Sequence, residues 1–292
     1  MTDTIRFSER VVVVTGSGAG LGRAYVLEFA KRGAKVVVND IDQAAANSVV
    51  SEINALTGYS SAAVTDYNSV TDGNKIISNA ISVFGRIDVL VNNAGILRDI
   101  SFAKMNEADW DRLYDVHLKG TFSCTHAAWK YMMAQKYGRI ITIASIAGIC
   151  GNFGQANYAA MKSSMIGFTK SLAKEGAKYG IKVNCLVPLA ESRMTAKLLP
   201  EEAKTIMSPE NVSPVVALLG HDCCRDSGEI IEVAGGWISK IRFQRAYGAY
   251  IRPPFSAEKL LENWSQVGDF SEPDYPSDIS DTIIVSMRKA RL

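Results

Sequence analysis

The sequence predicts an α/β protein built on a doubly wound parallel sheet of about seven strands, followed by a C-terminal extension. Between Val11 and Val233, short apolar runs alternate with amphipathic helical patterns. The first run, Val11–Val14, is apolar throughout, as expected for a strand buried on both faces of a parallel sheet. Strands and helices that alternate at this spacing indicate βαβ units with right-handed crossovers.

Composition and charge exclude several classes of protein. The 292 residues are 47% hydrophobic and 21% charged, which is ordinary for a globular protein with a full core. A net charge of +2 does not argue for a nucleic-acid or membrane partner. The N-terminus has no apolar signal region, and no apolar run approaches the length of about 18 residues that a membrane span needs.

The cysteines indicate a reducing compartment rather than a disulfide framework. There are five of them, an odd number, and none are arranged as Cys-x-x-Cys. The three histidines do not lie at ligand spacing to these thiols, so we expect no structural zinc.

A glycine-rich loop, Thr15–Gly22, follows the first strand and opens a helix over Arg23–Lys31. A glycine pattern between a strand and a helix indicates a dinucleotide-binding site and predicts a Rossmann-type sheet. Gly16 permits a tight turn, Gly20 lets the backbone approach a pyrophosphate, and Gly22 lets the helix pack on the strand. The helix N-terminus then offers unpaired N–H groups to the phosphates. The competing interpretation is a plain flexible turn.

Asp40 ends the second strand, Lys35–Asp40, and comes 18 residues after Gly22. A carboxylate at this position binds the adenosine ribose hydroxyls and repels a 2′-phosphate, so it favours NAD over NADP. Arg23 would weaken this preference unless it only covers the helix surface. The alternative for Asp40 is a cap on the next helix, Asp42–Leu56, and the two roles are compatible.

Polar residues also follow the third and fourth strands. Asp66 lies just beyond a strand over Ser60–Val64, where it could meet the adenine edge or serve as a turn or cap. After a helix over Ser69–Phe84, a strand over Asp88–Val91 ends in Asn92–Gly95. These amides and the glycine suit either backbone contact with a cofactor or a cross-link between strands.

The remaining elements complete the alternation. In order, they are a helix over Trp110–Gln135 that contains His117, a strand over Arg139–Ala144, a helix that carries Tyr158 and Lys162 and ends near Lys178, and strands over Ile181–Val187 and Glu229–Val233. We expect Pro188 to close the sixth strand.

Ser145, Tyr158 and Lys162 could act together in proton transfer. Ser145 follows the fifth strand, where open α/β sheets place their ligands. Tyr158 and Lys162 are four residues apart and share a helix face. A cation beside a phenol favours the phenolate and lowers its pKa from about 10. The competing interpretation is a chance pairing of a half-buried tyrosine with a solvated lysine.

These motifs, in this order and spacing, resemble the short-chain dehydrogenase/reductase family over about residues 8 to 238. Further segments are similar to the (3R)-hydroxyacyl-CoA dehydrogenase branch found in peroxisomal multifunctional enzymes: Ile96–Asp99, Val116–Gly120, Gln135–Ile140, Gly151–Tyr158, Ser192–Thr195 and the extension after Trp237.

The resemblance implies a set of site residues. The catalytic residues would be Ser145, Tyr158 and Lys162. The NAD-binding residues would be Gly16, Ser17, Gly20, Leu21, Gly22, Asp40, Asp66, Asn93, Ala94, Gly95, Tyr158, Lys162, Pro188 and Thr195. His117 stands where the family usually has an asparagine in a proton relay, so it is a possible relay residue. Leu189 after Pro188 replaces a common glycine.

The resemblance also implies an activity, a partner and a location. The activity would be NAD-dependent oxidation of a (3R)-3-hydroxyacyl-CoA to the 3-ketoacyl-CoA in peroxisomal β-oxidation. The partners would be the acyl-CoA substrate and a second copy of the chain in a homodimer. The tail Ala290–Leu292 is a variant of the Ser-Lys-Leu peroxisomal signal and would bind the import receptor.

We expect residues 1–238 to form the catalytic domain and residues 239–292 an extension that takes part in the dimer contact and the substrate cleft. Four of the eight prolines lie in the last 40 residues. The extension begins with four bases, which could bind CoA phosphates or pair with acids at an interface: Lys240, Arg242, Arg245 and Arg252. The chain is either free-standing or part of a longer one, and its C-terminal tail favours a natural end.

Three other functions compete with this prediction. A hydroxysteroid or other secondary-alcohol dehydrogenase would share the fold and the three catalytic residues. A ketoacyl reductase that uses NADPH is disfavoured by Asp40. A non-catalytic dinucleotide sensor would not need Ser145, Tyr158 and Lys162 together.

Overall fold

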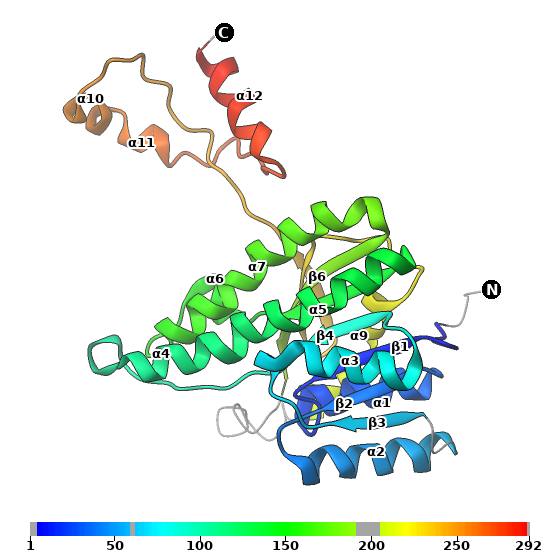
Figure 1. The fold of residues 1–292 in the computed structure, drawn as a ribbon. Coiled ribbons are helices and arrows are strands. Elements are labelled where there is room, and N and C mark those ends of the chain that lie inside the picture. Colours follow the sequence, from blue (N-terminus) through cyan, green and yellow to red (C-terminus); the bar gives the residue numbers. More distant parts are fainter. Residues whose placement is uncertain (1–4, 59–61, 191–204, 291–292) are drawn as a thin grey trace. The chain divides into compact units, whose positions relative to one another are not determined.

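The computed structural model describes residues 5–58, 62–190 and 205–290 (Figure 1). The chain divides into two compact units, Met1–Lys240 and Ile241–Leu292. No helix in the described ranges is both long enough and apolar enough to cross a membrane.

An eight-stranded sheet in the order β3-β2-β1-β4-β5-β6-β7-β8 forms the centre of the first unit. Every neighbouring pair from β3 to β7 is parallel. The order reverses between β1 and β4, and open α/β sheets bind ligands at the carboxyl ends of the strands beside such a reversal. The strands are β1 Val11–Thr15, β2 Lys35–Asn39, β3 Ala63–Asp66, β4 Val89–Asn92, β5 Gly138–Ile143, β6 Ile181–Leu189, β7 Ile230–Ala234 and β8 Trp237–Ile241.

Helices cover both faces of this sheet, because successive strand residues point to opposite sides. Val12 and Val14 pack with α1 (Gly20–Lys31), α2 (Gln43–Thr57) and α9 (Ser213–Gly220). Val11 and Val13 pack with α3 (Gly73–Phe84), α5 (Gly120–Gln135) and α7 (Ala156–Gly176). Figure 1 shows α3, α5 and α7 in front of the strands. The predicted doubly wound fold is confirmed.

The long helix predicted over Trp110–Gln135 is built from three segments. Helix α4 (Glu107–Leu113) continues into a π-helical segment, η3 (Tyr114–Lys119), and then into α5. Such π segments are rare, and they often occur at functional sites. His117 lies within η3.

Short elements connect the larger ones. They are η1 Val70–Asp72, η2 Phe102–Lys104, α6 Ala147–Cys150, η4 Ala177–Tyr179 and η5 Pro209–Asn211.

Several strand assignments differ from the sequence prediction. Strand β3 extends past the predicted end at Val64, so Asp66 is its last residue and does not lie beyond it. Strand β6 does not close at Pro188 but continues to Leu189, because Pro188 and Leu189 remain paired with Val233 and Ala234 of β7. Strand β8 is not predicted, and it crosses the predicted boundary after residue 238. It lies at the edge of the sheet with none of its residues fully buried, so it does not form the unbroken apolar run of a strand buried on both faces.

The second unit contains α10 (Ala257–Glu262), α11 (Trp264–Val267) and α12 (Ile279–Ala290). Arg245 donates hydrogen bonds of 2.9 and 2.6 Å to the two carboxylate oxygens of Asp274. The Arg242 guanidinium stacks 3.6 Å from the ring centroid of Tyr275. These two bases of the extension therefore already have partners within their own unit.

Candidate active site

The glycine loop has the close packing that a dinucleotide cradle requires. A Cβ on Gly22 would lie 2.3 Å from the carbonyl oxygen of Gly16, and a Cβ on Gly16 would lie 2.8 Å from Cα of Ala94. Gly20 has a left-handed φ of +54°, and a Cβ there would meet no described atom within 4 Å. The first turn of α1 contains no acidic residue, so its N–H groups face this space without a competing carboxylate. The loop therefore fits a pyrophosphate.

Asp40 lies against the glycine loop. One of its carboxylate oxygens accepts from the Gly18 N–H at 2.9 Å, and the other accepts from the Asp42 N–H at 3.0 Å. The cap of α2 is Asp42, which accepts from the Ala45 N–H at 3.1 Å. The acid at the end of β2 is thus placed beside the cradle, while its neighbour performs the capping role.

Arg23 is engaged away from the cradle. Its guanidinium donates to both carboxylate oxygens of Glu52 on α2. A base held in this way covers the surface between α1 and α2.

Ser17 and Asp66 are used inside the fold. The Ser17 N–H donates to the Asn39 carbonyl at 2.8 Å, and its hydroxyl donates to the Val14 carbonyl at 2.8 Å. Asp66 is 3% exposed, and its carboxylate accepts from the side-chain amides of Asn39, Asn68 and Asn79. The Asp66 carboxylate also accepts from the Asn68 N–H at 2.9 Å, which is the turn role predicted as one alternative. The contact with the adenine edge stays a prediction.

Asn93 cross-links the ends of β1 and β4. Its side-chain amide donates to the carbonyls of Thr15 and Gly16, each at 2.9 Å. The Thr15 hydroxyl accepts in turn from the N–H groups of Asn93 and Ala94 at 3.0 and 3.1 Å. These bonds fix Ala94 and Gly95 beside the glycine loop.

Ser145, Tyr158 and Lys162 come together at the carboxyl end of β5. Ser145 lies two residues after the end of β5 and is half-buried, as is Tyr158 in the first turn of α7. The Lys162 ammonium donates to the Ile143 carbonyl at 2.7 Å and lies 5.6 Å from the centroid of the Tyr158 ring. Lys162 is only 5% exposed, so it is not the solvated surface lysine of the competing interpretation.

Burial controls the ionisation of these groups. It raises the pKa of Tyr158, whereas a hydrogen bond with Ser145 lowers this pKa and the Asp99 carboxylate raises it. Burial also lowers the pKa of Lys162 to about 8. The expected lowering of the Tyr158 pKa is therefore wrong for the chain alone, because loss of hydration of the phenolate outweighs the hydrogen bond.

His117 is buried against Tyr158. Its ring meets the Tyr158 ring edge-on at a centroid distance of 5.5 Å. Burial and the charge of Lys162 lower its pKa to about 3, so the imidazole is neutral. Its Nε2 lies 2.8 Å from the Ile96 carbonyl oxygen and 3.1 Å from the Ile96 nitrogen. Both contacts are made by Nε2, which donates to the Ile96 carbonyl in one tautomer and accepts from the Ile96 N–H in the other.

Gly95 is required by this histidine. A Cβ on Gly95 would lie 2.8 Å from the His117 Cε1. The glycine that ends the Asn92–Gly95 motif therefore makes room for the imidazole.

Two of the other predicted cofactor residues lie within the chain's helices and strands. Leu21 lies in the first turn of α1, and Pro188 lies near the carboxyl end of β6. Thr195 lies outside the described residues, as do Arg291 and Leu292 of the predicted import signal.

Sequence reasoning did not assign a role to Asp99, Gln155 and Asn157. The Gln155 amide donates to both oxygens of Asp99, and the buried Asn157 accepts from the N–H of Tyr158. The sequence contained a signal for these residues, because they lie in two of the segments that resemble the hydroxyacyl-CoA dehydrogenase branch.

A family model described as short chain dehydrogenase matches residues 10–203, and the chain belongs to this family. The chain is similar to a solved structure of a 7α-hydroxysteroid dehydrogenase that is complexed with NADH and 7-oxo glycochenodeoxycholic acid. That structure has a TM-score of 0.73, is 29% identical, and covers 81% of this chain and 97% of its own.

The predicted branch is confirmed by more similar relatives. The peroxisomal multifunctional enzyme type 2 of Drosophila melanogaster is 49% identical over 95% of this chain and 48% of its own length. Its full-length structure has a TM-score of 0.86, with 44% identity over 98% of this chain and 50% of that one. The peroxisomal hydratase-dehydrogenase-epimerase of Neurospora crassa is 47% identical over 100% of this chain and 34% of its own length.

The chain thus spans between a third and a half of the length of these relatives. Their names agree with the predicted peroxisomal location.

Proposed function

We propose that this chain is the NAD-dependent (3R)-hydroxyacyl-CoA dehydrogenase of peroxisomal fatty acid β-oxidation. The observation that carries the proposal is the assembly of Ser145, Tyr158 and Lys162 beside a glycine loop. The similarity to multifunctional enzymes named as peroxisomal and as dehydrogenases supports the substrate class and the location.

Tyr158 acts as the general base in the oxidation direction. It takes the proton of the substrate's 3-hydroxyl as the C3–H bond breaks, and Ser145 holds the reacting oxygen by a hydrogen bond. The nicotinamide supplies the hydride acceptor for the electron pair that leaves C3. Lys162 binds the nicotinamide ribose, and its ammonium, held at the Ile143 carbonyl, favours the phenolate.

His117 positions Tyr158 as a neutral imidazole, and its predicted proton-relay role stays a prediction. A pKa of about 3 means that protonating this imidazole near neutral pH would cost about 5 kcal/mol, at about 1.4 kcal/mol per pH unit. Its edge-on contact with the Tyr158 ring and its bond to Ile96 instead hold the phenol in place.

Asp40 selects NAD rather than NADP. Its carboxylate lies against the N–H of Gly18, where a ribose 2′-phosphate would meet a second negative charge. Arg23 does not offset this charge, because its guanidinium is paired with Glu52.

The substrate is an acyl-CoA, and the active form is a homodimer in which the extension contributes to the dimer contact and the cleft. The tail Ala290–Leu292 binds the peroxisomal import receptor. The bases of the extension lend the CoA assignment little support, because Arg245 is paired with Asp274 and Lys240 with Asp226.

The test compares wild type with Tyr158→Phe. Turnover of a (3R)-hydroxyacyl-CoA should fall at least about a hundredfold in the variant, the usual scale of acid–base catalysis, with the affinity for NAD retained. A non-catalytic sensor would show no turnover in either protein. A hydroxysteroid dehydrogenase would have a higher kcat/KM for estradiol than for the CoA ester.

A further inference from the structure

Two segments of the chain, one after β4 and one before α7, form hydrogen bonds with each other beside the first turn of α7. The Ile100 N–H donates to the Gly154 carbonyl at 2.8 Å, and the Asn157 side-chain amide donates to the Arg98 carbonyl at 3.2 Å. Between these bonds, the Gln155 amide donates to both carboxylate oxygens of Asp99, each at 3.1 Å. We call the segments Arg98–Ile100 and Gly154–Asn157 the clasp.

The clasp leads directly to the catalytic tyrosine. Asn157 is fully buried, and its side-chain oxygen accepts from the Tyr158 N–H at 2.8 Å. Gln155 precedes the first residue of α7, but its side chain bonds to Asp99 instead of capping the helix. Its carbonyl oxygen accepts from Asn152 at 3.0 Å, so both ends of the Gln155 amide are oriented. The first turn of α7 is therefore anchored to the chain that follows β4.

The clasp also holds the exposed Asp99 carboxylate on Gln155, three residues before Tyr158. The groups that face this phenol are Ser145, His117, Lys162 and Asp99. His117 is neutral. The Asp99 carboxylate raises the pKa of Tyr158. A positive charge such as the Lys162 ammonium, 5.6 Å from the centroid of the Tyr158 ring, favours the phenolate instead. Within the described ranges, no ion pair neutralises Asp99, whose hydrogen bonds come from the neutral Gln155 amide.

We propose that Asp99 and Gln155 are positioning residues, through which the clasp holds the first turn of α7 and sets the charge balance at Tyr158. The mechanical role belongs to Gln155, whose hydrogen bonds to Asp99 connect the two segments. Asp99 supplies the electrostatic part, because its charge opposes ionisation of the phenol. The inference rests on the proposed function in one respect, namely that Tyr158 carries the proton.

The two roles are separated by two variants in the full chain with NAD and a (3R)-hydroxyacyl-CoA. Asp99→Asn removes the charge but keeps an oxygen that accepts from Gln155. The midpoint of its pH profile of kcat should move to lower pH by about half a unit, the scale of one nearby charge in a partly solvated site. Gln155→Ala keeps the charge and removes the tie. Its kcat should fall at least about tenfold because Tyr158 is misplaced, with the KM for NAD changed less than about twofold.

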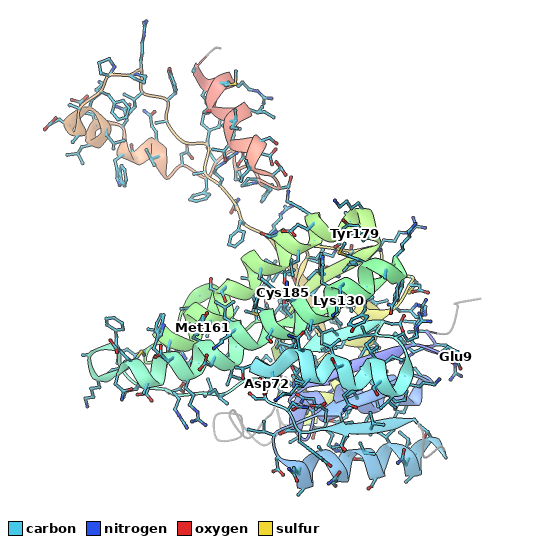
Figure 2. The ribbon with its side chains drawn as sticks, in the orientation of Figure 1. Glu9, Asp72, Lys130, Met161, Tyr179 and Cys185 are labelled. Carbon is cyan, nitrogen blue, oxygen red and sulfur yellow. The ribbon has the colours of Figure 1, made fainter. Side chains whose placement is uncertain are left out.

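The matched control is Asp72→Asn, which removes an exposed carboxylate paired with Lys75. Figure 2 labels Asp72 at the start of α3 and Met161, the neighbour of Lys162, on α7. The control should leave both kcat and the pH profile unchanged. An Asp99→Asn profile that superimposes on wild type overturns the electrostatic role, and a Gln155→Ala kcat within about twofold of wild type overturns the mechanical role.

A second readout keeps the inference separate from the proposed activity. Ring-labelled tyrosine can be titrated by NMR in the NAD-free protein, with the Tyr158 signal assigned from Tyr158→Phe. The Tyr158 titration should move to lower pH in Asp99→Asn. If wild type does not turn over the CoA ester but this shift is seen, the proposed function fails and the electrostatic role of Asp99 stands. If turnover is seen without the shift, the role of Asp99 fails alone.

Discussion

The buried imidazole of His117 should make the stability of this protein depend on pH, and His117→Asn should remove that dependence. The ordinary pKa of histidine is about 6.5, and burial lowers that of His117 to about 3. Between these values, the unfolded chain binds a proton that the folded chain excludes. Stability therefore rises with pH in this window and is lost as pH falls below about 6.5.

The size of the effect follows from these two values. A pH of about 5 lies about 1.5 units below the ordinary histidine pKa. Proton binding therefore stabilises the unfolded state there by about 2 kcal/mol, at about 1.4 kcal/mol per unit. Wild type should lose this amount between about pH 7.5 and pH 5, in addition to what its other groups contribute. His117→Asn should lose about 2 kcal/mol less over the same interval, whatever its stability at the higher pH.

Urea unfolding followed by tryptophan fluorescence measures both proteins at both pH values, at one fixed chain concentration because an oligomer's stability depends on it. The control is His126→Asn, which changes an exposed histidine of α5 and should behave like wild type. Equal losses of stability in wild type and His117→Asn would refute the assignment of a buried neutral imidazole.

Three other substitutions test separate parts of the structure. Gly95→Ala should cost about 1 to 3 kcal/mol of stability, because the new Cβ would lie 2.8 Å from the His117 Cε1. Asn has no Cε1, so a double-mutant cycle with His117→Asn should recover at least about 1 kcal/mol of this cost. Additive effects of the two substitutions would contradict the clash. Asp88→Ala should lower the free energy of unfolding by about 3 kcal/mol in chemical denaturation, because this buried carboxylate accepts from Arg10, Arg86 and the Val11 N–H. A loss below about 1 kcal/mol, the scale of an exposed ion pair, would show that these bonds do not stabilise the fold. Asp40→Ala should shift the ratio of kcat/KM for NAD over NADP toward NADP by at least about tenfold, and an unchanged ratio would mean that another residue selects the cofactor.

Most of the sheet could be predicted because its strands are buried on both faces. All five residues of β1 are buried, and the first four, Val11–Val14, appear in the sequence as an unbroken apolar run. Strand β8 could not be found in this way. It lies at the edge of the sheet, with exposed residues at Trp237 and Ile238.

The positions of the catalytic residues followed from local spacing, but their environment did not. Ser145 follows a strand, and Tyr158 and Lys162 share a helix face, so the motif alone brings them together. The direction of the Tyr158 pKa depends on burial, which the motif does not contain. The bond between Asp99 and Gln155 joins two loops 56 residues apart, and no sequence period connects such positions.

The most direct test of the central claim is the initial rate of NAD reduction with the separate 3R and 3S isomers of a 3-hydroxyacyl-CoA. We expect the 3R isomer to be oxidised by wild type at least about a hundredfold faster than the 3S isomer, and at least about a hundredfold faster than by Tyr158→Phe. Equal rates with the two isomers, or an undiminished rate in Tyr158→Phe, would contradict the proposed function.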